Sequence, residues 1–116
     1  MDASDLLGNH CKPVAGDSTP LPSSRVQTLL AALHSDWAND AAGREICRTF
    51  RFENYYQTIA FVNALAWIAH SEDHHPDIEV GYNRCQIRYS THAIGGLSEN
   101  DFICAAKIDA LLPSSE

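Results

Sequence analysis

One stretch of this chain combines a long apolar helix pattern with an abrupt stop. Asn54 is suited to cap the start of a helix, with Gln57 at its third position. After this cap, apolar residues recur at intervals that give a wide apolar helix face: Ile59, Phe61, Val62, Leu65, Ala66, Ile68 and Ala69. Pro76 disfavours helical backbone at the residue before it, so we expect one long helix over residues 55–73 that ends at a histidine pair.

Segments on both sides of this helix alternate between apolar and polar residues, as strands do. Residues 78–82 and 85–91 form two such runs around a polar corner, which is typical of an antiparallel hairpin. In the second run the odd-numbered residues are expected to face the core, so that His92 falls on the polar side at the end of the strand. Residues 46–52 predict a further strand, and residues 37–42 are expected to pair back on it as a second hairpin.

Two shorter helices are predicted from their capping residues. Ser24 can cap a helix, with Gln27 at its third position, that continues to about residue 34. Ser98 can cap the last helix, with Asp101 at its third position, and apolar residues extend this helix to about residue 112.

The order of these elements defines the fold class. Residues 1–22 contain three prolines and two glycines without helical or strand periodicity, so we expect a flexible lead-in with little structure. Residues 23–116 then form one domain, in the order helix, two strands, helix, two strands, helix. We therefore predict an α+β, two-layer αββαββα fold, with a four-stranded antiparallel sheet and three helices packed on one face.

The composition excludes several classes of function. A net charge of −7, from fifteen acidic residues against eight Lys and Arg, would be repelled by a phosphate backbone, so no direct nucleic-acid binding is expected. No membrane association is expected either, because the longest apolar run, residues 59–69, is too short to span a bilayer. The N-terminus carries Asp2 and Asp5 and lacks a secretory signal pattern, so we expect a cytoplasmic protein. Free thiols without Cys-x-x-Cys spacing are expected at Cys11, Cys47, Cys85 and Cys104.

Four of the six histidines lie within 23 positions of one another. They are His70, His74, His75 and His92. Neutral imidazole accepts a proton and imidazolium donates one near pH 7, so such a cluster favours proton transfer or metal binding.

Residue types alone leave alternatives open for this cluster. His70 and His74 are four apart on a helix and share a face, as in His-Glu-x-x-His zinc sites, but Ser71 stands where that motif has its acid. A three-ligand metal site completed by His92 is one alternative. A second is purely structural, because histidines at a helix end are favoured by the helix dipole and Asp101 can serve only as a capping acid.

Several of these residues form one longer pattern: His70, His74-His75-Pro76, Tyr82, His92 and Asp101. In this pattern the chain resembles the pterin-4a-carbinolamine dehydratase family, also known as the dimerisation cofactor of a homeodomain transcription factor. The likeness covers about residues 24–112 and implies that residues 23–116 are a dehydratase-like αββαββα domain. His70 stands where animal members of the family have Glu.

The resemblance implies dehydration of 4a-hydroxytetrahydrobiopterin to quinonoid dihydrobiopterin and water, in recycling of the pterin cofactor of aromatic amino acid hydroxylases. It implies that His74 and His92 are the acid and the base and that His75 positions the substrate. Asp101 would orient or charge a histidine, and the remaining supporting residues would be His70, Pro76 and Thr91. Neither a metal nor a bound cofactor is required, because the pterin is the substrate.

The resemblance also bears on partners. Family members assemble as dimers or tetramers, so a homodimer or homotetramer is expected, with an aromatic amino acid hydroxylase as a further partner. The alternative function is a non-catalytic one on the same fold, in protein binding, assembly or transcriptional coactivation. Retention of the three histidines His74, His75 and His92 favours the chemical function.

Overall fold

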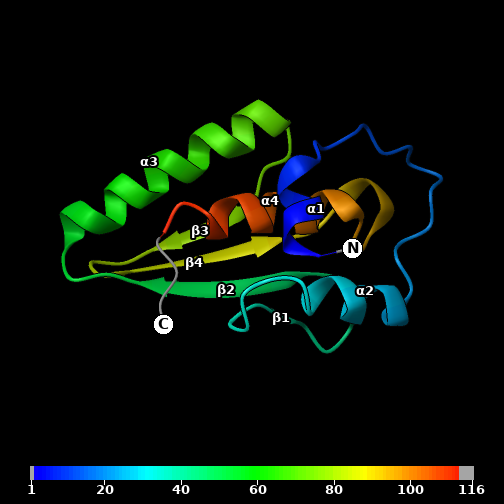
Figure 1. Cartoon of the computed structure of the whole chain (residues 1–116), viewed down its shortest axis with the longest axis horizontal. Coiled ribbons are helices and arrows are strands. Elements are labelled where there is room, and N and C mark those ends of the chain that lie inside the picture. The colour runs from blue at the N-terminus through cyan, green and yellow to red at the C-terminus, as the bar shows by residue number, and fades with distance from the viewer. Residues whose placement is uncertain (1, 113–116) are drawn as a thin grey trace.

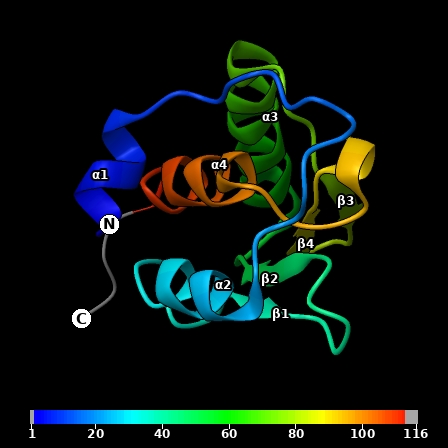
Figure 2. The ribbon, with the colours of Figure 1, turned by 90° about the vertical axis from the view of Figure 1, so that its right-hand side faces the viewer.

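A four-stranded antiparallel sheet in the order β1-β2-β4-β3 forms one layer of the computed structural model, which describes residues 2–112 (Figure 1). The strands are β1 (Ala38–Asn39), β2 (Ile46–Arg51), β3 (Asp77–Val80) and β4 (Arg84–Tyr89). The helices are α1 (Ala3–Gly8), α2 (Ser23–Leu30), α3 (Tyr55–Glu72) and α4 (Glu99–Asp109), and a 3-10 turn, η1, covers His92–Ile94. Helices α2, α3 and α4 lie on the same side of the sheet, which confirms the predicted α+β fold (Figure 2). Met1 of the predicted lead-in (residues 1–22) and residues 113–116 of the predicted domain (residues 23–116) lie outside the described residues.

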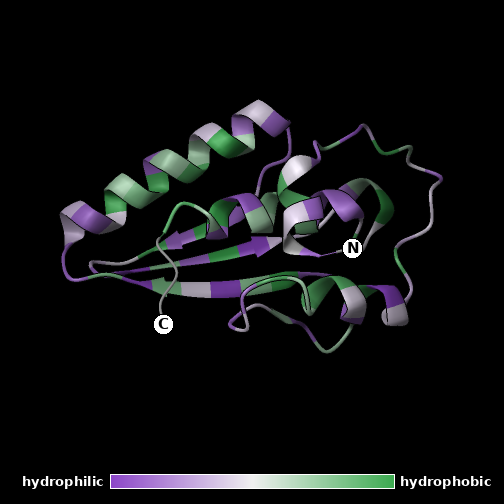
Figure 3. Ribbon diagram, in the orientation of Figure 1, coloured by the Kyte–Doolittle hydropathy of each residue, from purple (hydrophilic) through white to green (hydrophobic). Residues whose placement is uncertain are grey.

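The central strands β2 and β4 follow the predicted alternation. Hydrophobic and hydrophilic residues succeed one another along both strands (Figure 3), and the antiparallel register pairs Ile46 with Tyr89 and Phe50 with Cys85. The odd-numbered residues of β4 are buried, as predicted, and so is Thr91 just beyond its end. One face of the sheet therefore packs on the helices and the other carries mainly polar side chains.

Arg48 interrupts the alternation of β2, and the structure gives the reason. Its side chain is largely buried and its Nη1 lies 2.7 Å from Oδ1 of Asp109, the last residue of α4. The same carboxylate oxygen accepts a hydrogen bond of 2.8 Å from Nε1 of Trp37. The guanidinium also lies 4.1 Å from the centre of the Phe50 ring. Arg48 thus binds the sheet to the end of α4, because a buried charge requires such partners.

Helix α4 is the central helix of the fold. Its residues from Asn100 to Ala106 are all buried, because α1, α3 and the sheet surround it (Figure 2). A helix that is buried all round lacks the polar face of a surface helix. The side chains at its first turn are therefore inside the protein, which is unusual for Asn100 and Asp101.

Helix α3 buries a narrower face than its sequence predicted. Only Thr58, Phe61, Leu65 and Ala69 are buried. Of the other residues of the predicted apolar face, Ala66 is exposed, and Ile59, Val62 and Ile68 are half-buried. Trp67 and Tyr56 are 70% and 81% exposed on the outer side. No helix in residues 2–112 is long and apolar enough to cross a membrane.

The segment before residue 22 is more structured than predicted. It contains the helix α1, which is capped by Asp2, and the side chain of Leu6 is fully buried in the core. The segment that follows α1 then arches around α4 on its way to α2 (Figure 2). It contacts the turn before α4, where the amide of Leu21 donates to the carbonyl of Leu97 at 2.9 Å. The expectation of little structure was wrong because these contacts are with residues far away in the sequence.

Replacing Leu6 with Ala is expected to lower the free energy of unfolding by about 2–5 kcal/mol, because it leaves a cavity beside α4. The neighbouring Leu7 is 40% exposed, so Leu7→Ala is the matched control and is expected to change stability by less than about 1 kcal/mol. Urea unfolding followed by circular dichroism measures both values. Equal, small losses in the two variants would contradict the packing of α1 on the core.

Candidate active site

The pair His74-His75 directly follows the end of α3, where the chain turns back. Asp73 adopts a left-handed conformation with φ of 52° and reverses the chain, and the amide of His74 donates to the carbonyl of Ala69 at 3.1 Å. Pro76 disfavours helical backbone at His75, the residue before it, and β3 begins at Asp77. The predicted stop of the helix therefore sets the position of His74.

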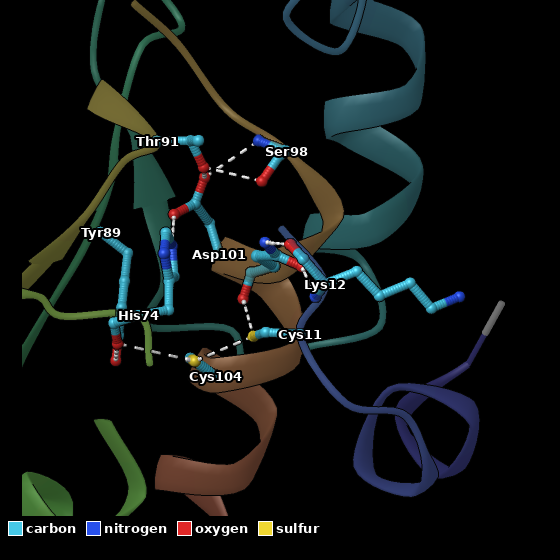
Figure 4. A network of polar contacts seen from close by, with 9 residues as sticks. Cys11, Lys12, His74, Tyr89, Thr91, Ser98, Asp101 and Cys104 are labelled. Atoms are coloured by element: carbon cyan, nitrogen blue, oxygen red, sulfur yellow. Dashed lines mark hydrogen bonds and ion pairs between the residues drawn. The ribbon is translucent and has the colours of Figure 1, made fainter. Parts of the chain in front are cut away.

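The His74 ring is held from two sides (Figure 4). Its Nε2 lies 2.6 Å from Oδ1 of Asp101, and its plane stacks on the Tyr89 ring at 16°, with the ring centres 5.2 Å apart. The hydroxyl of Tyr89 donates to the backbone carbonyl of His74 at 3.1 Å. Both the side chain and the backbone of His74 are thus fixed by buried partners.

Asp101 links three segments of the chain. Its side chain is fully buried, and its Oδ2 accepts hydrogen bonds of 2.9 Å from the Thr91 hydroxyl and from the backbone amide of Ser98 (Figure 4). Its Oδ1 faces His74. Asp101 therefore caps α4, as its position in the sequence predicted. It also contacts a histidine, as the family resemblance implied.

Asp101 changes the acidity of His74. Burial alone would lower the pKa of His74, but the hydrogen bond and the negative charge of Asp101 outweigh it and raise the pKa above the ordinary value of 6.5. Because a carboxylate only accepts hydrogen bonds, Nε2 of His74 carries a proton. Proton exchange with a ligand is then left to Nδ1, which has no hydrogen-bond partner among the described residues.

A pocket of about 330 Å³ lies beside His74. This volume is in the range of small-molecule sites. The pocket brings together His74, His75, Thr91 and His92, and its other lining residues are Lys12, Pro13, Val14, Asp73, Ser90, Ala93 and Asn100. His75 and His92 are exposed and His74 is half-buried. Three imidazoles in one small pocket, one of them paired with a buried carboxylate, can both donate and accept protons.

Other predicted site residues lie outside this pocket. His70 is exposed on α3, with its ring centre 6.1 Å from that of Trp67. Pro76 directs the backbone but does not line the pocket, and Tyr82 stacks on Tyr55 with the ring centres 6.3 Å apart. His92 does not end a strand, since β4 stops at Tyr89, but begins the turn η1.

Sequence reasoning missed two contributors to the site. Tyr89 was recognised as a core residue, but nothing in the alternation indicated that its ring would stack on a histidine. Lys12, Pro13 and Val14 belong to the lead-in, which has no periodicity that could have shown their position. In residues 2–112 no three His, Cys, Asp or Glu side chains are grouped as metal ligands.

Comparison with known sequences identifies the relatives of this chain. The profile of the family described as pterin 4 alpha carbinolamine dehydratase matches residues 19–111. A protein of Nitrosomonas eutropha, provisionally named a pterin-4-alpha-carbinolamine dehydratase, is 58% identical over 95% of this chain and 96% of its own. A protein of Legionella pneumophila with the same provisional name is 52% identical over 94% of this chain and 96% of its own.

Solved structures show the same fold. A protein of Brucella melitensis described as a transcriptional coactivator/pterin dehydratase is 30% identical, with a TM-score of 0.76 over 80% of this chain and 98% of its own. A pterin dehydratase-like protein described as a RuBisCO assembly factor in the alpha-carboxysome is also 30% identical, with a TM-score of 0.61 over 71% of this chain and 95% of its own. The chain therefore belongs to the pterin-4a-carbinolamine dehydratase family.

Proposed function

We propose that this protein dehydrates 4a-hydroxytetrahydrobiopterin to quinonoid dihydrobiopterin and water. The observation that carries the proposal is the pocket in which His74, His75 and His92 meet, with His74 paired to the buried Asp101. The family membership supports the same reaction. A direct test is to follow formation of the quinonoid dihydropterin from chemically prepared carbinolamine, with and without the protein.

The reaction needs one proton donor and one proton acceptor. The bond from C4a to the hydroxyl oxygen breaks, the hydroxyl leaves as water after it takes up a proton, and the proton on N5 is removed. The raised pKa of His74 favours its protonated form, so we assign His74 as the donor to the leaving hydroxyl. His92 is the proposed acceptor of the N5 proton and His75 the residue that positions the ring.

After each turnover the proton balance is restored through solvent. His74 has then lost a proton and His92 has gained one, so exchange with water returns both residues to their starting states. His92 is exposed, which permits rapid exchange. Thr91 acts indirectly in this scheme, because its hydroxyl holds Asp101, which in turn holds His74. The turnover consumes no net acid or base and uses no metal ion.

A second candidate function is binding to another protein, and an exposed aromatic surface on and near α3 supports it. The side chains concerned are Tyr55, Tyr56, Trp67 and Tyr82. The Brucella and carboxysome relatives are described as a coactivator and an assembly factor, respectively. Stoichiometric capture of a partner, together with no dehydration of the carbinolamine, would favour this function over the first.

The same surface supports self-association. Tyr56 and Trp67 are eleven residues apart on α3, which places them on one stripe of the helix. Large exposed aromatic residues on one stripe are typical of protein interfaces. We propose that two or more copies of the chain pack through this side of α3, as a homodimer or homotetramer.

Replacing His74 or His92 with Ala is expected to lower kcat at least about tenfold, because general acid or base catalysis contributes about 10²- to 10⁴-fold. Steady-state dehydration of the carbinolamine measures this effect, and circular dichroism checks that both variants fold. His70→Ala is the matched control and is expected to keep a rate close to that of the parent, because His70 lies outside the pocket. Near-normal rates in both pocket variants would refute the assignment.

Replacing Asp101 with Asn is expected to lower the pKa of His74, because burial remains while the carboxylate charge is lost. An NMR titration of the His74 ring measures the change. The stability that Asp101 adds by raising this pKa is fully present below 6.5, the ordinary histidine value, and disappears as the pH rises through the raised pKa. The stability difference between parent and variant should therefore shrink with rising pH; an unshifted titration would contradict the role of Asp101.

Replacing Trp67 with Glu is expected to reduce self-association, because the carboxylate would be buried unpaired in the proposed interface. Light scattering coupled to gel filtration measures the mass of each species. Asp17→Asn alters an exposed residue of the lead-in and is the control. A parent protein that is monomeric at all concentrations would disprove the interface.

A further inference from the structure

We propose that residues 11–14, here called the strap, form the outer wall of the histidine pocket and determine how tightly the pterin ring is bound. The inference rests on the proposed function for the identity of the ligand. Lys12, Pro13 and Val14 of the strap line the same pocket as His74 and His92. The strap lies outside residues 19–111, which match the family profile. It therefore adds a wall to the site that the matched domain does not itself contain.

Glu72 holds the first residue of the strap. Its Oε1 accepts a hydrogen bond of 2.7 Å from the amide of Cys11, and its Oε2 lies 2.8 Å from Nδ1 of His10. The Glu72 side chain is only 7% exposed, and Nζ of Lys107 lies 3.9 Å away. Burial alone would raise the pKa of Glu72, but these hydrogen bonds and the Lys107 charge outweigh it and lower the pKa. Glu72 is thus an ionised anchor at the end of α3, and it does not itself line the pocket.

Asn100 holds the second residue of the strap. The amide of Lys12 donates to Oδ1 of Asn100 at 3.0 Å, and Nδ2 of Asn100 donates to the carbonyl of Lys12 at 2.7 Å. Both backbone groups of Lys12 are thereby paired with one buried side chain. Asn100 precedes Asp101, so adjacent residues of α4 hold two parts of the pocket lining: Asp101 contacts His74, and Asn100 contacts the strap.

Cys11 provides a third attachment. Its sulfur lies 3.5 Å from Sγ of Cys104 (Figure 4). The same sulfur lies 3.5 Å from the carbonyl oxygen of Asn100. The hydrogen bond with Cys104, together with burial, raises the pKa of the Cys11 thiol, so it stays protonated and can donate. Three separate contacts, from α3 and α4, therefore hold a strap of four residues in one place.

The strap contributes a different surface from the histidines. Pro13 and Val14 are apolar, and the side chain of Val14 is half-buried. A flat heterocycle has two faces and a polar edge, and it binds best where apolar surface covers a face while polar groups meet the edge. The histidines supply the polar groups and the strap supplies apolar surface. We therefore expect the strap to contribute to binding of the ring and the histidines to proton transfer.

Glu72→Ala tests the inference from outside the pocket, because Glu72 does not line it. The variant is expected to raise KM for the carbinolamine about tenfold and to lower kcat much less, since uniform binding is lost. Glu72→Gln keeps an oxygen that can accept from the Cys11 amide and should recover most of the affinity. Glu53→Ala, a carboxylate near the other end of α3, is the control. An unchanged KM in Glu72→Ala would overturn the inference.

Two measurements do not depend on catalysis. The dissociation constant of 7,8-dihydrobiopterin, a stable pterin, is expected to rise about tenfold in Glu72→Ala, in parallel with KM. Hydrogen exchange by NMR is expected to show protected amides at Cys11 and Lys12 in the parent, and lost protection in the variant while α4 stays protected. Unprotected strap amides in the parent would overturn the inference.

A second variant covers the case in which Glu72→Ala does not fold. Val14→Asn leaves all three strap attachments in place and is expected to weaken pterin binding by removing apolar surface. An unchanged affinity for 7,8-dihydrobiopterin in this variant would overturn the inference that the strap forms a wall of the pocket. A parent protein that neither binds 7,8-dihydrobiopterin nor dehydrates the carbinolamine would instead refute the proposed function, so the two failures are distinguishable.

Discussion

The buried carboxylate of Asp101 is the interaction on which the site depends. Removing a charged group from water is costly unless donors replace the water, and Asp101 has three: the Thr91 hydroxyl, the Ser98 amide and the His74 ring. Thr91 lies just beyond β4, Ser98 caps the start of α4, and His74 follows the end of α3. Loss of any one of them would leave part of the charge unsatisfied, so the three segments hold one another in place.

The contacts of Asp101 contribute both to the stability of the fold and to the proposed chemistry of the site. The contacts that satisfy the buried Asp101 carboxylate also orient the His74 ring and raise its pKa, so the packing of the core prepares His74 for its proposed role as proton donor. The histidines without such support, His75 and His92, lie at the exposed side of the pocket. The site thus contains one imidazole that is fixed by the core and two that are in contact with solvent.

Much of this structure could be predicted from local patterns. The end of α3 at the histidine pair, the buried odd-numbered side of β4 and the cap formed by Asp101 all depend on residues close in sequence. The failures involve contacts between distant residues. Arg48 pairs with Asp109, Leu6 enters the core and Glu72 binds Cys11, and no periodicity encodes these pairings. His70 matched the family pattern by spacing, but one turn of helix separates it from the pocket that His74 enters after the chain reverses.

The contact between Cys11 and Cys104 spans 93 positions of the chain. The strap leaves the ribosome well before α4, to which it is attached. The sheet strands and α3 are complete before that helix exists, but until then the strap has only its attachment to Glu72 and lacks those to Asn100 and Cys104. A nascent chain therefore cannot hold the strap on α4 until that helix has been synthesised, so ligand binding would report on the formation of α4.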